Sequence, residues 1–503
     1  TINARCIRAF YSYTFAMPLR ICLIASEVAP LAKTGGLADV AGALTKYLHA
    51  AGHDVRLFMP LYKQIDRRRL NLWPVEFLQD VPLQLGAHAL RFSVSTTRLP
   101  GSDAMIYLID APALFARGTL YSNAPDEHLR FLLLTHAALM SCQRMGFSPQ
   151  ILHCNDWHTG FGPLLLRTTY AWDKLLQPTR SLLSIHNIAY QGVFGAAHID
   201  ELGLPAAASY VDAAELSAGN INPLREGVRH ADHVSTVSPT YAREIQTPAF
   251  GYGLDAILRA RAQSLTGILN GVDYQEWDPR NDRFLPQHFD ASQLGTKAAL
   301  KQEFLQRCGL ATQARSRLPL IGMVSRLASQ KGLDLMMQVL PRLLAEHGFC
   351  LALLGSGDAR YEQFLSQLAH EHPTRVAFRS GYSEKQAHWI EAASDMFLMP
   401  SQYEPCGLNQ MYSLRYGTIP IVRNTGGLAD SVQHFNPESR QGTGIVFNDY
   451  DAAGLTWAVS TALQWYAQPG LWQRLVQNAM AMDFSWEKQV REYVALYEKI
   501  IAA

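Results

Sequence analysis

The sequence predicts an α/β protein made of two doubly wound domains, each built on a parallel sheet. Three observations predict this fold class: apolar, strand-like runs alternate with amphipathic helical stretches, the alternation forms two separate series, and a segment rich in Pro, Gly and Asn lies between them. The apolar runs are continuous, which is typical of parallel strands covered on both faces. A chain of 503 residues with 48% hydrophobic content is long enough for roughly two to four domains.

The first series begins at Arg20 with an apolar strand, a glycine-bearing loop, an amphipathic helix and a second apolar strand, in the order of a β-α-β unit. Residues 151–170 and 181–190 continue the pattern. We therefore predict that residues 17–266 form an N-terminal Rossmann-like domain. Residues 1–16 carry two arginines, no acidic residue and an interrupted aromatic stretch, and we expect them to be a disordered N-terminal extension rather than a secretory or transit segment.

The second series begins near Leu318 and contains several further apolar runs. They lie at residues 350–355, 375–382, 396–401, 418–424 and 443–450. Pro, Gly and Asn cluster at residues 271–282, where we place a hinge. We predict a C-terminal Rossmann-like domain at residues 267–484, followed by a helix at residues 485–503 that crosses back to the N-terminal domain.

Composition excludes several classes of function. Lys and Arg total 44 against 43 Asp and Glu, so the net charge of +1 provides no overall field that would gather polyanions or hold the chain on an acidic membrane. The mean hydropathy is −0.05, and no apolar run reaches the length of a membrane span. The seven cysteines are scattered without a C-x-x-C pair, so we expect a reducing, cytoplasmic location.

One hexapeptide, Thr-Gly-Gly-Leu-Ala-Asp, occurs twice, at residues 34–39 and at residues 425–430. Each copy is predicted to be a loop that opens a helix. A helix N-terminus preceded by glycines presents free N–H groups and a positive dipole end to an anion. Tight strand-to-helix packing explains such glycines equally simply, and the two interpretations stay open for each copy.

Three charged residues of the second series suggest a site for a phosphorylated ligand. Arg326 and Lys331 lie five residues apart where a strand ends and a helix begins, so both can reach one phosphate-sized anion. A diphosphate leaving group needs such cations, or a metal, to neutralise its developing charge. Glu404 stands in a loop that runs into an amphipathic helix, where it could accept hydrogen bonds from sugar hydroxyls or act only as a helix-start acid.

Metal ligation has two candidate sets of residues, and each has a simpler explanation. His153, Asp156 and His158 could be drawn as ligands, and Asp449 and Asp451 form a D-x-D motif of the kind that holds a divalent ion in some sugar transferases. The D-x-D aspartates, however, are well placed as turn and helix-cap groups. P-loop, H-E-x-x-H and G-x-S-x-G motifs are absent from the sequence. We expect neither a metal nor a cofactor.

A set of longer motifs occurs in a fixed order from residue 23 to residue 432. They are LIASEVAPLAKTGGLADVAGAL, HCNDWHTG, SIHNIAYQGVF, STVSPTYAREI, GILNGVD, SRLASQKGLDL and PSQYEPCGLNQMYSLRYGTIPIVRNTGGLADSV. In content and order, the chain resembles the bacterial glycogen synthases and plant starch synthases. The resemblance implies a GT-B fold, in which two Rossmann-like domains face a deep inter-domain cleft.

The resemblance also implies roles for individual residues. The implied catalytic residues are Asp156, His186, Arg326, Lys331 and Glu404. The implied substrate-binding residues are Lys33, Gly35, Gly36, Asn187, Asn270, Tyr382, Cys406, Gly407, Thr425, Gly426 and Gly427. In this scheme Arg326 and Lys331 clasp the donor diphosphate, Lys33 approaches it from the first domain, and Tyr382 stacks on the adenine ring.

The implied reaction transfers glucose from ADP-glucose to the 4-hydroxyl at the non-reducing end of an α-1,4-glucan, such as glycogen or a maltooligosaccharide, with retention of configuration. Retention normally suggests a carboxylate nucleophile, but the family shows no obvious one, so front-face attack is implied. Nucleic acid and membrane partners are not expected, and a homo-oligomer is left open. The alternatives are a transferase that uses UDP-glucose and a non-catalytic glucan-binding homologue. Tyr412 stands where related transferases often have a second glutamate, which leaves ribose binding unassigned.

Overall fold

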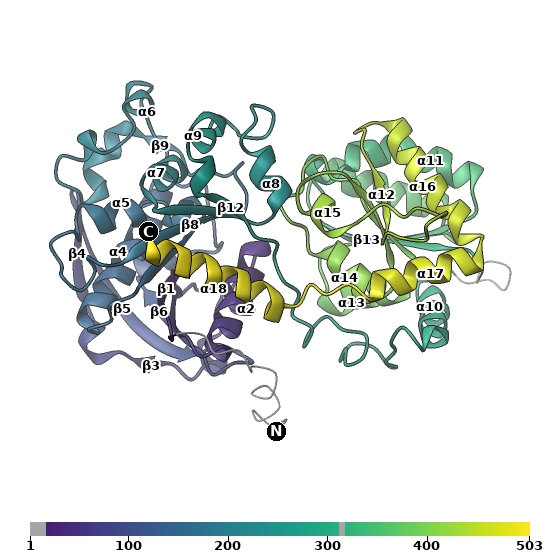
Figure 1. Ribbon diagram of the computed structural model, residues 1–503, viewed down its shortest axis with the longest axis horizontal. Coiled ribbons are helices and arrows are strands. Elements are labelled where there is room, and N and C mark those ends of the chain that lie inside the picture. The colour runs from purple at the N-terminus through teal and green to yellow at the C-terminus, as the bar shows by residue number, and fades with distance from the viewer. Residues whose placement is uncertain (1–16, 311–316) are drawn as a thin grey trace. The chain divides into compact units, whose positions relative to one another are not determined.

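The computed structural model describes residues 17–310 and 317–503, so the prediction for residues 1–16 lies outside the described residues (Figure 1). The chain divides into two compact units. Unit 1 comprises residues up to Val237, Ala242–Ile268 and Trp486–Ala503, and unit 2 comprises Ser238–Tyr241 and Leu269–Ser485. Within the described ranges, no helix is both long enough and apolar enough to cross a membrane.

Unit 1 is built around one large sheet. Its strands are β1 (Arg20–Ile24), β2 (Asp54–Pro60), β3 (Trp73–Pro74), β4 (Val81–Leu85), β5 (His88–Arg98), β6 (Met105–Asp110), β7 (Ile151–Asn155), β8 (Arg180–Ile185), β11 (His233–Thr236) and β12 (Leu265–Gly267), with β9 (Phe194–Gly195) and β10 (Asn220–Ile221) forming a separate pair. Its α-helices are α2 (Gly36–Ala50), α3 (Pro112–Phe115), α4 (Glu127–Arg144), α5 (Gly162–Arg167), α6 (Ala213–Ser217), α7 (Pro223–His230), α9 (Asp255–Ala260) and α18 (Trp486–Ala502). Its 3₁₀ helices are η1 (Arg67–Arg69), η2 (Glu76–Leu78), η3 (Trp157–Thr159), η4 (Ala196–Leu202), η5 (Ala207–Ser209) and η6 (Ala262–Ser264).

The strand order of the unit 1 sheet is β12-β11-β8-β7-β1-β2-β6-β5-β3, with β4 paired to β5. The chain moves outward from β1 through β2 and β6, then returns to the other side of β1 to add β7, β8, β11 and β12, all in parallel. The two directions of winding meet between β1 and β7. In doubly wound sheets, ligands bind at such a switch point, beyond the carboxyl ends of the strands.

One edge of the unit 1 sheet differs from the predicted parallel arrangement. Strands β3, β4 and β5 pair antiparallel with one another or with β6. In strand β5 the buried positions are separated by partly or fully exposed ones, as expected for a strand of an antiparallel sheet with one solvated face. Such a strand lacks the continuous apolar run that predicted the parallel strands.

Unit 2 contains the second doubly wound sheet. Its strands are β13 (Leu320–Val324), β14 (Cys350–Gly355), β15 (Val376–Ser380), β16 (Met396–Met399), β17 (Ile419–Arg423) and β18 (Ile445–Phe447). Its helices are α10 (Leu294–Arg307), η7 (Ser329–Lys331), α11 (Leu333–Glu346), α12 (Ala359–Glu371), α13 (Glu384–Ala393), α14 (Asn409–Arg415), α15 (Gly426–Ser431), α16 (Ala452–Tyr466) and α17 (Pro469–Met480), and α8 (Pro239–Glu244) spans the boundary between the two units. All strand pairs in the sheet are parallel, in the order β15-β14-β13-β16-β17-β18. The switch point of unit 2 therefore lies between β13 and β16.

The final helix α18 belongs to unit 1, where it packs beside α2 (Figure 1). Its buried side chains recur at helical spacing and include Tyr493 and Tyr497. The Tyr497 hydroxyl lies 2.8 Å from Nδ1 of His153 in β7, and Nε2 of His153 lies 2.7 Å from the Ser184 hydroxyl of β8. Both ring nitrogens of His153 are thus occupied inside the unit 1 core, so this side chain is not available to ligate a metal.

Candidate active site

The predicted cationic site of unit 2 lies at the switch point between β13 and β16. Arg326 follows β13 by two residues and is exposed, Lys331 ends the 3₁₀ helix η7, and Glu404 follows β16. The Lys331 ammonium donates to Oε2 of Glu404 at 2.6 Å, and the Ser401 hydroxyl donates to the same oxygen at 3.0 Å. Two residues 73 positions apart in the sequence are therefore in direct contact. They lie beyond the carboxyl ends of β13 and β16, where a ligand is expected.

The second copy of the hexapeptide packs against the loop that carries Glu404. Thr425, Gly426 and Gly427 are buried, and the amide of Gly427 donates to the carbonyl oxygen of Glu404 at 3.0 Å. A Cβ atom on Gly426 would overlap the carbonyl oxygen of Glu404, and one on Gly427 would overlap the carbonyl group of Cys406. The packing interpretation therefore accounts for these two glycines, which hold the loop after β16 in place.

In the first copy of the hexapeptide, by contrast, the second glycine is exposed and has free space around it. Gly36 is exposed, and a Cβ atom built on it has no heavy atom within 4 Å. Beside it, Lys33 is exposed and its ammonium lies 2.7 Å from Oδ1 of Asp39 in the first turn of α2. No packing demand explains Gly36, so the anion-binding interpretation stays a prediction for Gly35 and Gly36.

The first loop is shaped by Glu27, a residue for which the sequence predicted no role. Its carboxylate is buried after β1 and accepts from the Thr34 amide at 2.5 Å, the Thr34 hydroxyl at 2.8 Å and the Gly35 amide at 3.3 Å. Burial raises the pKa of Glu27, and these three donors oppose the increase. The only signal in the sequence was an acid inside an apolar stretch, which does not reveal a partner seven residues away.

Asn270, Cys406 and Gly407, for which glucose binding stays a prediction, lie together in unit 2. The Asn270 side chain is buried, and its Oδ1 atom has no hydrogen-bond partner among the described residues. The backbone amide of Asn270 bonds to the thiol of Cys406, and burial raises the pKa of that thiol. Gly407 adopts a φ of 71°, which favours glycine. A buried acceptor without a donor is costly unless a ligand supplies one, and a sugar hydroxyl can do so.

Asp156 directly follows β7 at the switch point of unit 1, and His186 directly follows the neighbouring strand β8. Oδ1 of Asp156 accepts from the His186 amide at 2.7 Å and from the Asn187 amide at 3.4 Å, while Nε2 of His186 lies 2.8 Å from Oδ1 of Asn155. Burial raises the pKa of Asp156 to about 7 and lowers the pKa of His186 to about 4. Asp156 also has a φ of 53°, an uncommon conformation for a residue other than glycine. Strain and a buried carboxylate at one residue are typical of a functional site.

His158, two residues further along the chain, was considered only as a metal ligand. Its ring is buried against Trp157, Tyr121 and Phe131, with centroid distances of 4.1, 4.7 and 4.6 Å. Its Nδ1 atom has no hydrogen-bond partner among the described residues, and burial lowers its pKa well below the ordinary value. The described residues do not assemble His153, Asp156 and His158 into a metal site. The neutral imidazole of His158 instead belongs to the aromatic wall beside Asp156.

Of three further residues that the sequence singled out, Asp451 and Tyr412 have structural explanations and Tyr382 does not. The Asp451 carboxylate accepts from the Gly454 amide at 2.7 Å, so the prediction that it caps a helix is confirmed at α16. Tyr412 is buried and stacks on Trp277 with a centroid distance of 4.0 Å, which explains the aromatic residue at that position. Tyr382 is 66% exposed, as a stacking role would require.

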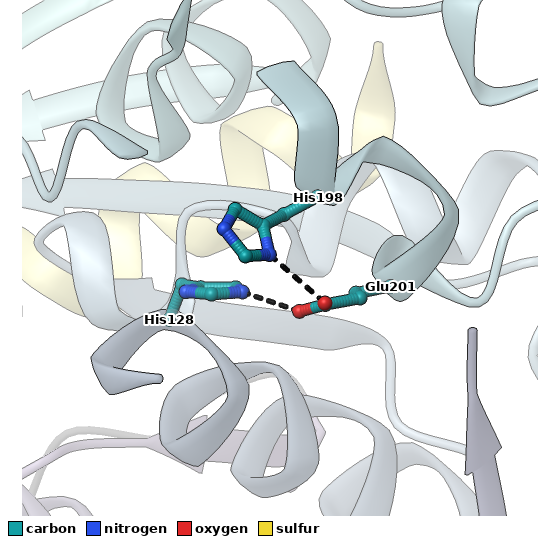
Figure 2. A group of neighbouring side chains, drawn as sticks. All are labelled: His128, His198 and Glu201. Carbon is teal, nitrogen blue, oxygen red and sulfur yellow. Dashed lines mark hydrogen bonds and ion pairs between the residues drawn. The ribbon is translucent and has the colours of Figure 1, made fainter. Parts of the chain in front are cut away.

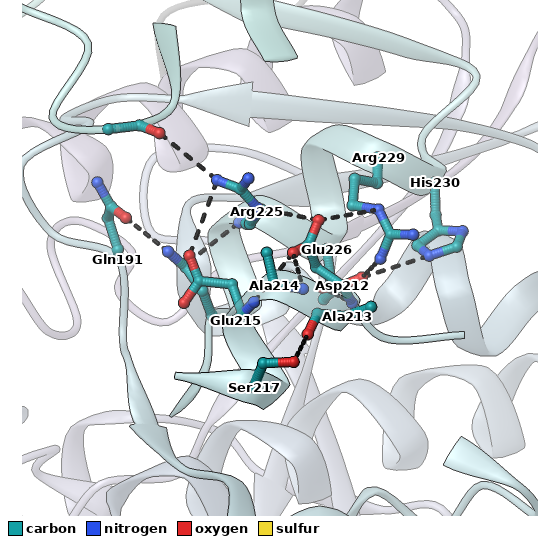
Figure 3. A network of polar contacts seen from close by, with 12 residues as sticks. Gln191, Asp212, Ala213, Ala214, Glu215, Ser217, Arg225, Glu226, Arg229 and His230 are labelled. Carbon is teal, nitrogen blue, oxygen red and sulfur yellow. Dashed lines mark hydrogen bonds and ion pairs between the residues drawn. The ribbon is translucent and has the colours of Figure 1, made fainter. Parts of the chain in front are cut away.

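The segment from Asn222 to Val234, which had no predicted role, contains a buried ionic network (Figure 3). Oε1 of Glu226 accepts from the Asp212 amide at 2.9 Å, and Oε2 lies 2.7 Å from Nη1 of Arg229. Arg225 adds a contact of 3.3 Å to the Asp212 carboxylate. This network ties α7 to the start of α6, so the segment has a structural role within unit 1.

The shifted pKa of Asp156 predicts that the free energy of unfolding depends on pH. The carboxyl pKa is about 7 in the folded protein and about 3.9 in an unfolded chain. The stabilisation from the bound proton is therefore complete below about pH 4 and is lost as the pH rises to about 7. We expect Asp156→Asn to gain roughly 2 kcal/mol of unfolding free energy relative to the wild type between about pH 5 and pH 7.5, measured by urea unfolding. The exposed Asp103→Asn serves as control, and parallel pH profiles for Asp156→Asn and the wild type would contradict the prediction.

Comparison with known proteins identifies the family. Residues 20–260 match the family model described as starch synthase catalytic domain, and residues 311–481 match the model of glycosyl transferases group 1. A glycogen synthase of Anaeromyxobacter dehalogenans is 45% identical over 96% of this chain and 100% of its own length, and one of Syntrophotalea carbinolica is 43% identical over 96% and 99%. The starch synthase IV catalytic domain of Arabidopsis thaliana, solved with ADP and acarbose, superposes with a TM-score of 0.89 at 33% identity over 97% of this chain and 100% of its own. These matches show that the chain has the GT-B fold and belongs to the family of bacterial glycogen synthases and plant starch synthases.

Proposed function

We propose that this protein uses ADP-glucose to extend an α-1,4-glucan at the non-reducing 4-hydroxyl, with retention of configuration. The family relationship establishes glucosyl transfer to a glucan; the choice of ADP-glucose and the residue roles are the proposal. The observation that carries it is the contact between Lys331 and Glu404 at the unit 2 switch point. In this contact a cation that can pair with a phosphate lies beside a carboxylate that can accept hydrogen bonds from sugar hydroxyls. A nucleotide sugar presents a phosphate on one side of the bond that breaks and sugar hydroxyls on the other.

In this proposal, unit 2 binds the donor. Arg326 and Lys331 neutralise the diphosphate, Glu404 and the unpaired Oδ1 of Asn270 accept hydrogen bonds from glucose, and Tyr382 stacks on the base. When the diphosphate binds, it competes with Glu404 for the Lys331 ammonium. The Ser401 hydroxyl remains as a partner for Glu404 in that state.

Unit 1 contributes Asp156, His186 and Asn187 to the acceptor side of the reaction. The bond between the anomeric carbon and the diphosphate oxygen breaks, and the acceptor 4-hydroxyl oxygen forms the new bond on the same face of the sugar. The departing phosphate takes the hydroxyl proton, so no protein nucleophile is needed. His186 is held neutral by burial and can bond to substrate without adding charge. Lys33, Gly35 and Gly36 form the anion-facing loop of this unit.

Comparison of the two donors tests the proposal directly. Turnover should be supported by ADP-glucose and should be at least tenfold lower in kcat/KM with UDP-glucose, because the loss of adenine stacking costs on the order of 1.4 kcal/mol. Tyr382→Ala should reduce this preference, whereas Tyr252→Ala, which removes another exposed aromatic ring, should not. Equal kcat/KM for the two donors would overturn the assignment of ADP-glucose.

We further propose that transfer needs no divalent ion. A Mg²⁺ or Mn²⁺ site prefers several carboxylate oxygens, but Glu404 is paired with Lys331 and Asp451 caps α16. Addition of EDTA is therefore expected to leave the initial rate of glucosyl transfer unchanged within about twofold. The measurement is release of ADP with and without the chelator. Loss of activity that Mn²⁺ restores would instead assign a role to Asp449 and Asp451.

A further inference from the structure

A cluster of histidines surrounds one glutamate in unit 1, and none of these residues is assigned to catalysis (Figure 2). Nε2 of His128 lies 2.6 Å from Oε2 of Glu201, and Nδ1 of His198 lies 2.9 Å from Oε1. Nε2 of His88 lies 3.3 Å from the same Oε1. Every ion-pair partner of Glu201 within the described residues is a histidine, and neither lysine nor arginine accompanies it.

The ligand atoms of His128, His198 and Glu201 all lie within 4.8 Å of one another. In a tetrahedral zinc site with bonds of about 2.0–2.1 Å, neighbouring ligand atoms are about 3.3 Å apart. Movements of about an ångström would therefore bring these three atoms to coordination distance. His88 and His198 are partly exposed, with 43% and 41% of their side-chain surface accessible, so rotation of their rings is possible and an ion can enter.

The chain positions these residues from three separate elements. His128 is in the first turn of α4, where its ring stacks on Phe194 at a centroid distance of 4.2 Å and an interplanar angle of 9°. His198 and Glu201 are three residues apart on the 3₁₀ helix η4, and side chains at that spacing lie on the same side of such a helix. His88 begins strand β5. A shared ligand would thus connect α4, η4 and β5.

We propose that His128, His198 and Glu201 bind a zinc-class divalent cation, with His88 as a fourth ligand. Imidazole nitrogens with one carboxylate form the donor set that such ions prefer over Mg²⁺ or Ca²⁺. The ion would replace the protons that now link the imidazoles to Glu201 and would stabilise unit 1 without taking part in glucosyl transfer.

Titration of the metal alone into the full-length, tag-free and chelator-treated protein tests this site. We expect Zn²⁺ to bind with one equivalent at high affinity, and Co²⁺ to give the visible absorption of a site with nitrogen and oxygen ligands. His198→Ala and Glu201→Gln should each weaken binding at least tenfold. The exposed His370→Ala, outside the cluster, should bind like the wild type.

Thermal unfolding provides a second measurement that does not depend on activity. Zn²⁺ should raise the Tm of the wild type but not that of His198→Ala, because an ion that binds only the folded state stabilises it. His198 is partly exposed, so its replacement is expected to leave the fold and the glucosyl transfer rate intact. Absence of saturable binding, or identical titrations for the wild type and His198→Ala, would overturn the proposal and leave a hydrogen-bonded cluster only. Because the activity assay with EDTA is separate, failure of this site would not affect the proposed function.

Discussion

Removal of either cation at the unit 2 switch point is expected to lower kcat on the order of a hundredfold or more, the range for loss of one preorganised group that stabilises developing charge. Arg326→Ala is the cleaner test. Arg326 is exposed and forms no ion pair within the part of the chain that the structure describes, so its loss should leave the Tm unchanged. The measurement is the steady-state rate with ADP-glucose at saturating glucan.

Lys331→Ala should show the same loss of kcat together with a lower Tm, because it leaves the buried carboxylate of Glu404 with Ser401 as its remaining side-chain partner. Arg474→Ala, which removes an exposed arginine from α17 of the same unit, is the matched control and should keep full activity. If Arg326→Ala and Lys331→Ala both retained wild-type kcat, the two cations would have no part in the departure of the diphosphate.

Gly427→Ala is expected to destabilise unit 2 by on the order of 3 kcal/mol, since the new methyl group would overlap the carbonyl group of Cys406, which belongs to the backbone and cannot rotate away. The same change would displace the loop that carries Glu404, so activity should fall as well. Denaturant unfolding, followed by a probe in unit 2, measures the effect.

Gly36→Ala is the matched control, because it makes the same chemical change in the first copy of the same hexapeptide. Gly36 is exposed, the new methyl group meets no atom within 4 Å, and alanine favours a helix start such as that of α2. We expect no loss of stability, but a lower rate if the anion-binding interpretation of this loop is correct. Equal destabilisation by Gly36→Ala and Gly427→Ala would contradict the conclusion that the first hexapeptide is exposed and the second is packed against the backbone.

Much of the fold was predictable because buried parallel strands form continuous apolar runs, and the family and fold class inferred from the sequence are confirmed. The Asp451 cap could also be read from the sequence, because capping depends on residues only three positions apart. The antiparallel strands β3, β4 and β5 were not predicted, since an antiparallel strand with one solvated face has a weaker pattern than a buried parallel strand.

The site was predictable only in part. Lys331 and Glu404 could be proposed from their charge and position, but their 2.6 Å contact depends on β13 and β16 being neighbours in the sheet. Glu27 and the histidines around Glu201 could not be found, because their partners come from distant segments or from loops without periodic pattern. The sequence also could not distinguish between the two hexapeptides, which are identical and differ only in what packs against them.

The position of α18 has a consequence for the order of events during protein synthesis. Unit 1 needs Trp486–Ala503, which follow all of unit 2 in the chain. Until Tyr497 has been added, Nδ1 of His153 lacks its hydroxyl partner. The side of α2 that α18 covers is also exposed to solvent until then. The ribosome therefore completes unit 2 before unit 1, although the synthesis of unit 1 begins first. During this interval the incomplete unit 1 exposes apolar surface that chaperones can bind.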